Sequence, residues 1–247
     1  DEIIDYDAGT DIQANGLALI AVNGIGQANT LETTVSTIAI NNSTSGNVNV
    51  TNTGALTIGS VGGVSGATNN GGDLTIYASS PLTVSSAISA AGNITLRATE
   101  DSIAPDDDLT VNATISSTGG GDITLQAGHD VILNANISTA GNVILNADYD
   151  GLAGQVGAIN QTGGIITASG LVATSTGNIT LTQNNDVNTF VGNSDHANKS
   201  VVGSIQFNDI DDVTIGTVSG VTGISTFNGA ITINAGGQLS ITNSSWI

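Results

Sequence analysis

The chain has 247 residues, of which 39% are hydrophobic and only 3% aromatic, and it contains 33 Gly, 2 Pro and no Cys or Met. It carries 21 acidic groups against two cations, Arg97 and Lys199, so at a net charge of −19 it lacks the basic patch that a nucleic acid or an anionic membrane surface would need. No apolar run approaches the ~18 residues of a membrane span, so we expect no membrane insertion.

Residues 1–15 are predicted to form an N-terminal strand or cap. Ile3, Ile4 and Tyr6 give this segment apolar side chains that could cover the first coil of a repeat or pair with another chain. Because the sequence starts at Asp1 and has no initiator Met, we expect it to be a processed or excised piece.

A short phrase then recurs along the chain. It begins with Gly, usually followed by Asp or Asn, and then alternates aliphatic with polar residues. Copies occur as GDLTIYA (72–78), GNITLRA (92–98), GDITLQA (121–127), GNVILNA (141–147), GNITLTQ (177–183) and GAITINA (229–235). Their opening glycines are 20, 29, 20, 36 and 52 residues apart. A constant phrase at elastic spacing indicates a constant strand joined by loops of variable length.

Within each copy, successive side chains point to opposite sides of the strand. In GDITLQA, Ile123, Leu125 and Ala127 share one side, and Asp122 and Thr124 share the other. One strand cannot bury its apolar side alone, whereas strands stacked at ~4.8 Å close a continuous aliphatic core. The predicted core includes Ile94, Leu96, Ile123, Leu125, Val143, Leu145, Ile179, Leu181, Ile231 and Ile233.

These features predict an all-β chain with one domain over residues 1–247. The expected architecture is a single parallel β-helix, or β-solenoid, of roughly 9–11 coils and about 50 Å in length. No apolar i, i+3, i+4 stripe supports a helix. A β-sandwich or a propeller would have an aromatic-rich core and more regular hairpin turns. We expect loop insertions at 99–108, 148–162 and 183–203.

The first two insertions concentrate acidic residues. Carboxylates that lie close together can hold Ca²⁺, which prefers oxygen ligands. Neither insertion matches an EF-hand loop or the Gly-rich calcium repeat, so we favour a solvated, charged loop and expect no obligatory cofactor. The weak calcium candidates are Glu100, Asp101, Asp106, Asp107, Asp108, Asp148 and Asp150.

Other residues that could carry chemistry are few. Arg97 points outward in GNITLRA, and its neighbours Glu100 and Asp101 favour a solvated ion pair over a catalytic cation. His129 and His196 lie without the spacing of a nucleophile or a metal site, so we interpret both as solvated loop histidines. No catalytic residue is predicted, and the chain is not expected to be an enzyme.

The alternation of apolar and polar residues that is typical of a strand continues towards the C-terminus. GAITINA and GQLSITN run on to Ser-Ser-Trp-Ile, with no capping helix in the pattern. Because the terminal coils of a solenoid leave backbone groups and an apolar cross-section without a neighbour, we predict end-to-end stacking on copies of the chain or on adjoining coils of a longer one. The predicted self-association residues are Ile3, Ile4, Tyr6, Trp246 and Ile247.

The repeated phrase, its ~20-residue period and the segment 37–66 resemble the shaft of filamentous-haemagglutinin-type exoproteins and the repeats of large bacterial surface proteins. The resemblance covers most of the chain from Gly16 onward. It implies a right-handed β-helix, export and a surface or fibrous role. The Asn-Pro motifs of that family's secretion domain are missing, because the only prolines are Pro81 and Pro105. The chain is therefore similar to shaft rather than to secretion domain.

The function expected from these features is a structural extracellular scaffold, either a shaft module of a bacterial surface adhesin or a subunit of an extracellular fibre. It would be secreted or held at the bacterial cell surface, and any receptor, a host or matrix glycan or protein, would contact the insertions. The alternative is a polysaccharide-binding or polysaccharide-cleaving β-helix. That function would need convergent carboxylates beside Arg97 or Lys199 on one face.

Overall fold

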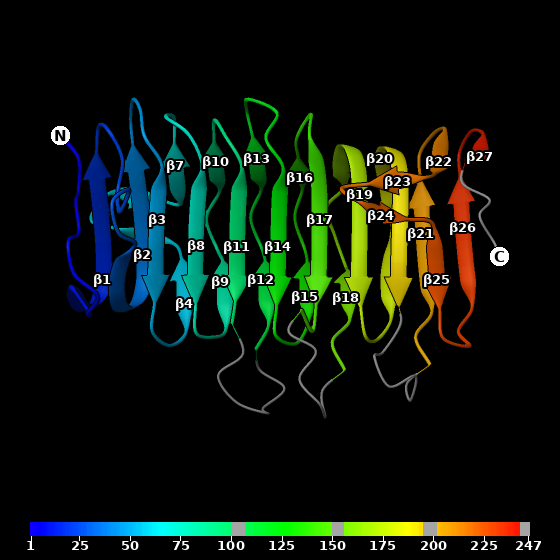
Figure 1. Ribbon diagram of the computed structural model, residues 1–247, viewed down its shortest axis with the longest axis horizontal. Coiled ribbons are helices and arrows are strands. Elements are labelled where there is room, and N and C mark those ends of the chain that lie inside the picture. Colours follow the sequence, from blue (N-terminus) through cyan, green and yellow to red (C-terminus); the bar gives the residue numbers. More distant parts are fainter. Residues whose placement is uncertain (100–106, 150–155, 195–201, 243–247) are drawn as a thin grey trace.

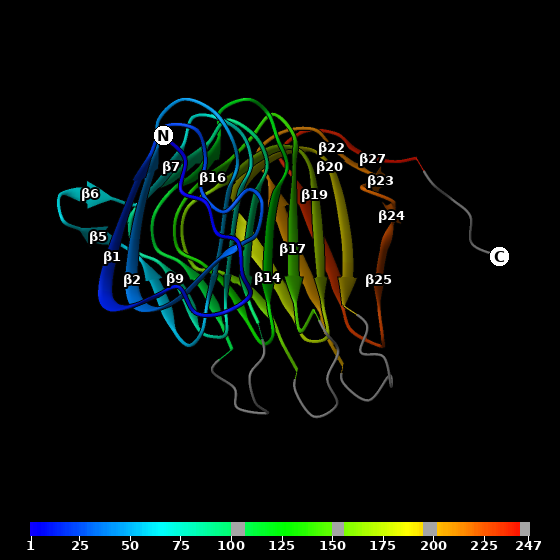
Figure 2. The same ribbon diagram turned by 60° about the vertical axis from the view of Figure 1, so that its left-hand side comes forward.

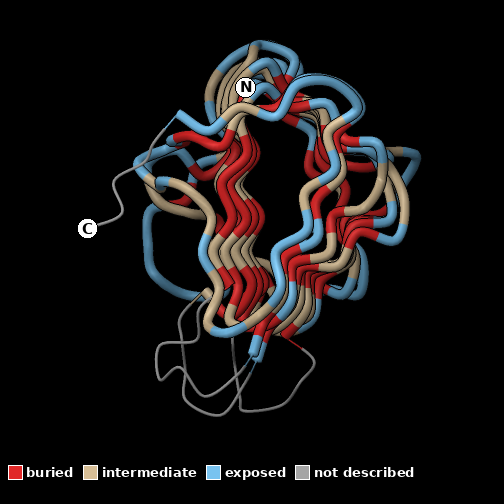
Figure 3. Tube along the Cα trace, turned by 90° about the vertical axis from the view of Figure 1, so that its right-hand side faces the viewer, coloured by how far each residue is buried: buried red, intermediate tan, exposed pale blue. Residues whose placement is uncertain are grey.

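The computed structural model describes residues 1–99, 107–149, 156–194 and 202–242, and every regular element in these ranges is a β-strand. The strands form one long parallel sheet that coils about a central axis (Figure 1). Viewed along the axis, the strands form walls in which buried residues alternate with residues of intermediate exposure (Figure 3). The predicted parallel β-helix is confirmed.

Each coil in the middle of the chain contributes one strand to each of three columns. Column 1 contains β3 (Val48–Asn52), β8 (Leu74–Ala78), β11 (Ile94–Ala98), β14 (Ile123–Ala127) and β17 (Asn142–Ala147), and continues into β19 (Ile166–Ser175) and β20 (Ile179–Ser194). Column 2 contains β1 (Ile12–Ala21), β2 (Leu31–Asn42), β4 (Leu56–Ile58), β9 (Leu82–Val84), β12 (Leu109–Val111), β15 (Val131–Leu133), β18 (Ile159–Gln161), the first part of β20, β21 (Ile205–Asp209) and β26 (Ile231–Ala235). Column 3 runs from the end of β2 through β7 (Ala67–Asn69), β10 (Ile88–Ala90), β13 (Ile115–Ser117) and β16 (Ile137–Ser138) to β19.

Three further strands and two hairpins complete the described chain. The strands are β22 (Val213–Ile215), β25 (Ile224–Thr226) and β27 (Leu239–Ile241), at the C-terminal end. The antiparallel hairpins leave the main sheet on its outside (Figure 2), and they consist of β5 (Ser60–Val61) with β6 (Val64–Ser65) and β23 (Thr217–Val218) with β24 (Val221–Thr222). Column 2 runs through ten successive paired strands, in agreement with the predicted coil number.

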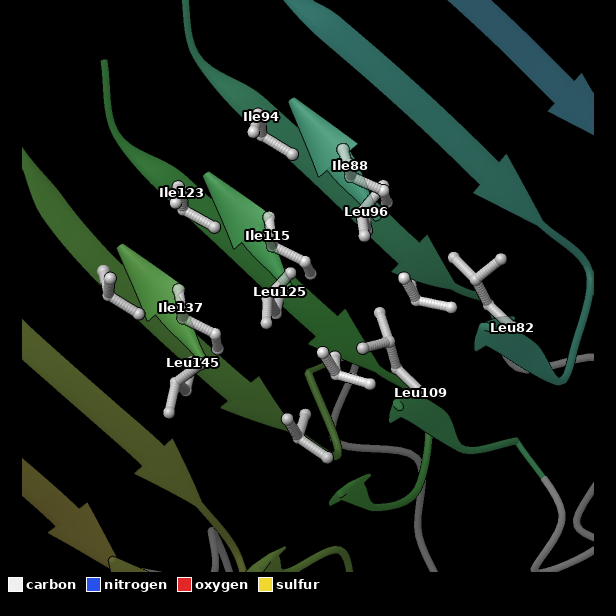
Figure 4. Close-up of a cluster of buried hydrophobic side chains, with 14 of the residues drawn as sticks. Leu82, Ile88, Ile94, Leu96, Leu109, Ile115, Ile123, Leu125, Ile137 and Leu145 are labelled. Atoms are coloured by element: carbon white, nitrogen blue, oxygen red, sulfur yellow. The ribbon is translucent and has the colours of Figure 1, made fainter. Parts of the chain in front are cut away.

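In the middle of the chain, successive core strands pair without a shift in register. Ile94 pairs with Ile123 and Leu96 with Leu125, so like side chains lie directly above one another in rows (Figure 4). Full burial of each such side chain stabilises the fold by ~1.5–3 kcal/mol. The predicted core residues from Ile94 to Leu181 are all fully buried. The prediction is wrong for the last two, because within the described residues no coil follows β26 and β27 to cover them: Ile231 is 46% exposed and Ile233 is only partly buried.

Two predicted insertions have wrong boundaries. Residues 183–194 belong to β20 and Ile159–Gln161 is β18, so neither stretch is loop. The elastic spacing of the repeated phrase predicted loops there, but polar side chains can also lie buried at the corners of the coils when they are hydrogen-bonded. Asn185 is fully buried, and its amide exchanges hydrogen bonds with Gln161 at 2.8 and 3.1 Å.

The N-terminal segment pairs with the first coil of its own chain. Ile3 forms a parallel bridge with Ile25, and the Ile3 N–H donates to the Gly24 carbonyl at 3.0 Å. Ile3 packs against the core, whereas Ile4 and Tyr6 are exposed. Of the predicted self-association residues at this end, Ile3 is therefore engaged within the chain. Trp246 and Ile247 lie outside the described residues.

Candidate functional sites on the outer surface

The Asp or Asn of the repeated phrase ties each coil to the next. The Asp73 Oδ1 accepts the backbone N–H of Asn93 at 2.8 Å, the Asn93 Oδ1 accepts that of Asp122 at 2.8 Å, and the Asp122 Oδ1 accepts that of Asn142 at 2.8 Å. The preceding glycine leaves room for this side chain, because a Cβ on Gly92 would lie 2.3 Å from the Asp73 Oδ1. This outward column is therefore a hydrogen-bond ladder that explains the Gly-Asp/Asn pair.

A second group of acidic residues surrounds His129 at the corner before column 2. The His129 Nδ1 lies 2.8 Å from the Asp108 Oδ1 and 3.7 Å from the Asp130 Oδ1, and all three side chains are partly buried. The predicted solvated histidine is therefore wrong for His129. His196 lies outside the described residues.

Asp108, His129 and Asp130 each place one ligand atom within 4.8 Å of the others, so they have the donor set to hold a cation. The same oxygens also serve the fold, since the Asp108 Oδ1 accepts the Asp130 N–H at 3.0 Å and the Asp130 Oδ1 accepts the Ala158 N–H at 2.7 Å. Burial raises the pKa of Asp130, and the Ala158 N–H and His129 oppose this rise. The geometry thus fits a coil-to-coil ladder without requiring a metal.

The structure brings calcium candidates from two predicted insertions to this corner. The His129 N–H donates to the Asp107 carbonyl at 2.9 Å, and the Asp148 N–H donates to the His129 carbonyl at 3.1 Å. Both Asp107 and Asp148 are buried, and the Asp148 Oδ2 accepts the Thr176 hydroxyl at 2.6 Å. The remaining candidates lie outside the described residues: Glu100, Asp101, Asp106 and Asp150.

Sequence reasoning missed a third acidic group, in the N-terminal segment. Asp5, Asp7 and Asp11 place carboxylate oxygens within 4.8 Å of one another. The Asp7 N–H, donating at 3.0 Å, lowers the pKa of Asp5. Burial raises the pKa of Glu32, and the neighbouring Asp5 raises it further. The close spacing of three aspartates in DYDAGTD was the available signal.

Arg97 lies at the centre of a polar and aromatic cluster on the outer face of column 1. Its guanidinium lies 4.5 Å from the centre of the Tyr77 ring and 4.9 Å from that of Tyr149. Its Nε and Nη2 donate to the Gln126 Oε1 at 2.9 and 2.6 Å. Cation–π contacts of this kind are worth ~0.5–2 kcal/mol each. Tyr77 and Arg97 are 20 residues apart in the sequence, and the strand register places them directly beside each other.

The predicted ion pair of Arg97 with Glu100 or Asp101 falls on acidic residues outside the described ranges. Within those ranges Arg97 forms no ion pair with a carboxylate. Two open hollows of about 460 and 430 Å³ occur elsewhere on the surface, and neither is lined by an acidic, basic or histidine residue. The described surface therefore offers an aromatic-cation cluster and acidic corners, and Tyr149 of the cluster directly follows Asp148 of the His129 corner.

Comparison with protein-family models, with curated proteins and with solved structures gives no match to this chain. Among the residues that the structure describes, none forms a helix that could cross a membrane. The resemblance to filamentous-haemagglutinin-type shafts therefore stays an expectation from the repeated phrase.

Proposed function

We propose that the chain is a structural module, a shaft segment of an extracellular scaffold such as a bacterial surface adhesin or fibre. The observation that supports this proposal is the continuity of the pairing: parallel strand pairs join successive coils along the described length, with a register shift between β20 and β21. The Asp and Asn ladder adds side-chain bonds between the same coils. Adjoining coils would stack at its ends.

A wall built in this way suits a load-bearing role. Its backbone N–H and C=O groups bond along the axis, so bending the rod stretches many hydrogen bonds at once. The buried hydrophobic residues from Leu19 to Ile215 form one continuous cluster, which includes the stacked rings of Phe190 and Phe207. The net charge of −19 keeps neighbouring rods apart laterally. Receptor contacts, where they occur, would belong to the loops.

Rigidity can be tested with two spin labels, because the chain has no native Cys. Thr44 and Asp211 are exposed and lie near opposite ends, so Thr44→Cys with Asp211→Cys spans most of the rod. A shaft predicts one narrow distance by pulsed electron paramagnetic resonance. A broad or bimodal distribution would argue against the role. Labelling of intact source cells by an antibody against the chain tests the extracellular placement.

A second candidate function is binding of an acidic polysaccharide, and the Tyr77–Arg97–Tyr149 cluster is the observation that favours it. A guanidinium between aromatic rings offers a charge for a carboxylate and a face for a sugar ring. Calorimetric titration with polygalacturonate tests this function. Binding that Arg97→Ala removes, and that Asn234→Ala at the same position of the repeated phrase leaves intact, would support it. Turnover of that polymer, abolished by Arg97→Ala, would replace the shaft proposal with an enzyme.

A further inference from the structure

The C-terminal part of the chain repeats its N-terminal part. Residues 47–84 and 204–241 align without a gap at a constant offset of 157 residues. The best-matched stretch is IGSVGGVSG (58–66) against IGTVSGVTG (215–223). Further upstream, IQANGL (12–17) matches ITASGL (166–171).

The two hairpins within this match have the same construction. Val61 pairs with Val64 in the first, and Val218 pairs with Val221 in the second. Each is closed by one backbone bond between glycines, from the Gly66 N–H to the Gly59 carbonyl at 2.7 Å and from the Gly223 N–H to the Gly216 carbonyl at 2.8 Å. Both turns have two residues with positive φ, Gly62 and Gly63 in one and Ser219 and Gly220 in the other.

The correspondence extends to the whole set of strands. Each pairing among β1–β9 recurs between the strands numbered eighteen higher, β19–β27. The repeating unit is therefore the run from β1 to β18, and the described chain holds one unit and half of a second. The copies differ by one column, since β3 and β8 lie in column 1 whereas β21 and β26 lie in column 2. The two hairpins consequently lie on different faces (Figure 2).

In the first copy, the coil formed by β8 and β9 is covered by the next coil. Leu74 pairs with Ile94, and Leu82 pairs with Leu109. Leu74, Ile76 and Leu82 are all fully buried as a result. The covering coil belongs to residues 85–117, which contain β10 to β13.

In the second copy, the same surface is uncovered. Ile231 and Leu239, the counterparts of Leu74 and Leu82, are 46% and 43% exposed, and Ile241 is 69% exposed. They border an apolar hollow of about 200 Å³. We define the C-terminal face by the lining of that hollow, namely Ile215, Gly223, Ile224, Ile231, Ile233, Leu239 and Ile241.

We propose that the C-terminal face is a docking surface for one kind of partner, a β-solenoid coil with the sequence character of residues 85–117, arranged after it in a tandem array of this unit. The first copy shows the complete interface, because there residues 85–117 cover the equivalent surface formed by β8 and β9. Beyond β27 the sequence continues with Thr242 and Asn243 and then SSWI (244–247), which resembles SSAI (85–88) after a shift of two residues from the offset of 157. This inference goes beyond the shaft role, because it holds whether or not the rod bears load.

The chain's own first coil does not fit this position in the repeat. The counterpart of β1 is β19, which stacks on β16 and β17 rather than on a coil like β26 and β27. In addition, Ile3 already pairs with Ile25 at the N-terminal end. The N-terminal segment therefore lies beyond Ile25, on the side that a second copy would approach.

The test uses single cysteines at matched positions of the two copies. Leu239→Cys should react quickly with a thiol reagent, and Leu82→Cys only after unfolding, which also reports that the rod is folded. Adding residues 85–165 after Thr242 should slow labelling of Cys at position 239 at least tenfold. Hydrogen exchange of residues 229–242 in the unsubstituted fusion should slow likewise, which gives a second readout independent of the cysteine.

Two fusions of equal length serve as controls: residues 12–92, which start at the wrong coil, and a scrambled 85–165. An unchanged labelling rate in the 85–165 fusion would overturn the proposal. Equal protection by either control would show that the C-terminal face does not require a coil like residues 85–117, and would overturn that part of the proposal. Protection in the unextended chain that is lost on dilution would identify a second copy as the occupant instead, and would also overturn it.

Discussion

Asp209 offers a sharp test of the packing at the coil corners. It is 5% exposed, and its carboxylate accepts the Val187 N–H at 3.1 Å and the Asp211 N–H at 3.2 Å. Burial raises its pKa to about 6, against the lowering effect of these two N–H groups, and the Asp211 carboxyl adds to the rise. At pH 7 this carboxyl is therefore mostly ionised, and its charge is less favourable in the folded chain than in the unfolded one.

The first copy of the repeat has an amide in this place. Asn52, the counterpart of Asp209, accepts the Val35 N–H at 2.8 Å. Its Nδ2 donates to the carbonyls of Thr53 and Gly54 at 3.3 and 3.1 Å. An amide at 209 should keep the acceptor for Val187 and add donors for nearby carbonyls, without the buried charge.

The expected change in the free energy of unfolding follows from the shift in the pKa of Asp209. The folded value of about 6 lies above the ordinary 3.8, so the folded chain binds more protons than the unfolded one between those pH values. The associated stability is present below about pH 4 and is lost as the pH rises through 6. A shift of this size corresponds to at most ~3 kcal/mol. We therefore expect Asp209→Asn to stabilise the fold by about 1–3 kcal/mol at pH 7, and by little at pH 4.

Equilibrium urea denaturation at pH 4 and pH 7, approached from both the folded and the unfolded side, measures this difference. Asn52→Asp is the converse variant, and it should lower stability at pH 7 more than at pH 4. An equal gain at both pH values, or no gain at pH 7, would refute the assignment of a strained carboxylate at this corner.

Three further outcomes are expected. Leu125→Ala should destabilise the fold by about 2–5 kcal/mol in urea denaturation because it opens a cavity in a fully buried row; Ile231→Ala, on the uncovered face, should cost less than about 1.5 kcal/mol, and equal losses would contradict the burial pattern. Asp122→Ala should cost about 0.5–1.5 kcal/mol by leaving the Asn142 N–H without its acceptor, and Asp122→Asn should restore most of the loss. Chelation with EDTA should leave the melting temperature unchanged; a fall that Ca²⁺ reverses, and that Asp108→Asn removes, would instead establish a metal at the His129 corner.

The local sequence pattern was sufficient to predict the strands of the repeated phrase and most of the core residues. The alternation in GNITLRA and GDITLQA places Ile94, Leu96, Ile123 and Leu125 on one side, and repetition of the phrase along the chain supplies like strands against which these residues are buried. The period-2 signal depends only on neighbours in the chain, so it can be read without coordinates. The same signal could not reveal that Ile231 is exposed, because exposure depends on whether another coil lies beyond it.

Only the tertiary structure decided which distant residues meet. Tyr149 reaches Arg97, and Asp108 reaches His129, because loops of unequal length bring different parts of successive coils to the same corner. Asn185 was predicted to lie in a loop, but its side chain is buried. A polar side chain can lie in the interior when partners from other coils satisfy its hydrogen bonds, as Gln161 does here. Those partners are set by the stacking register, which is a property of whole coils rather than of any one segment.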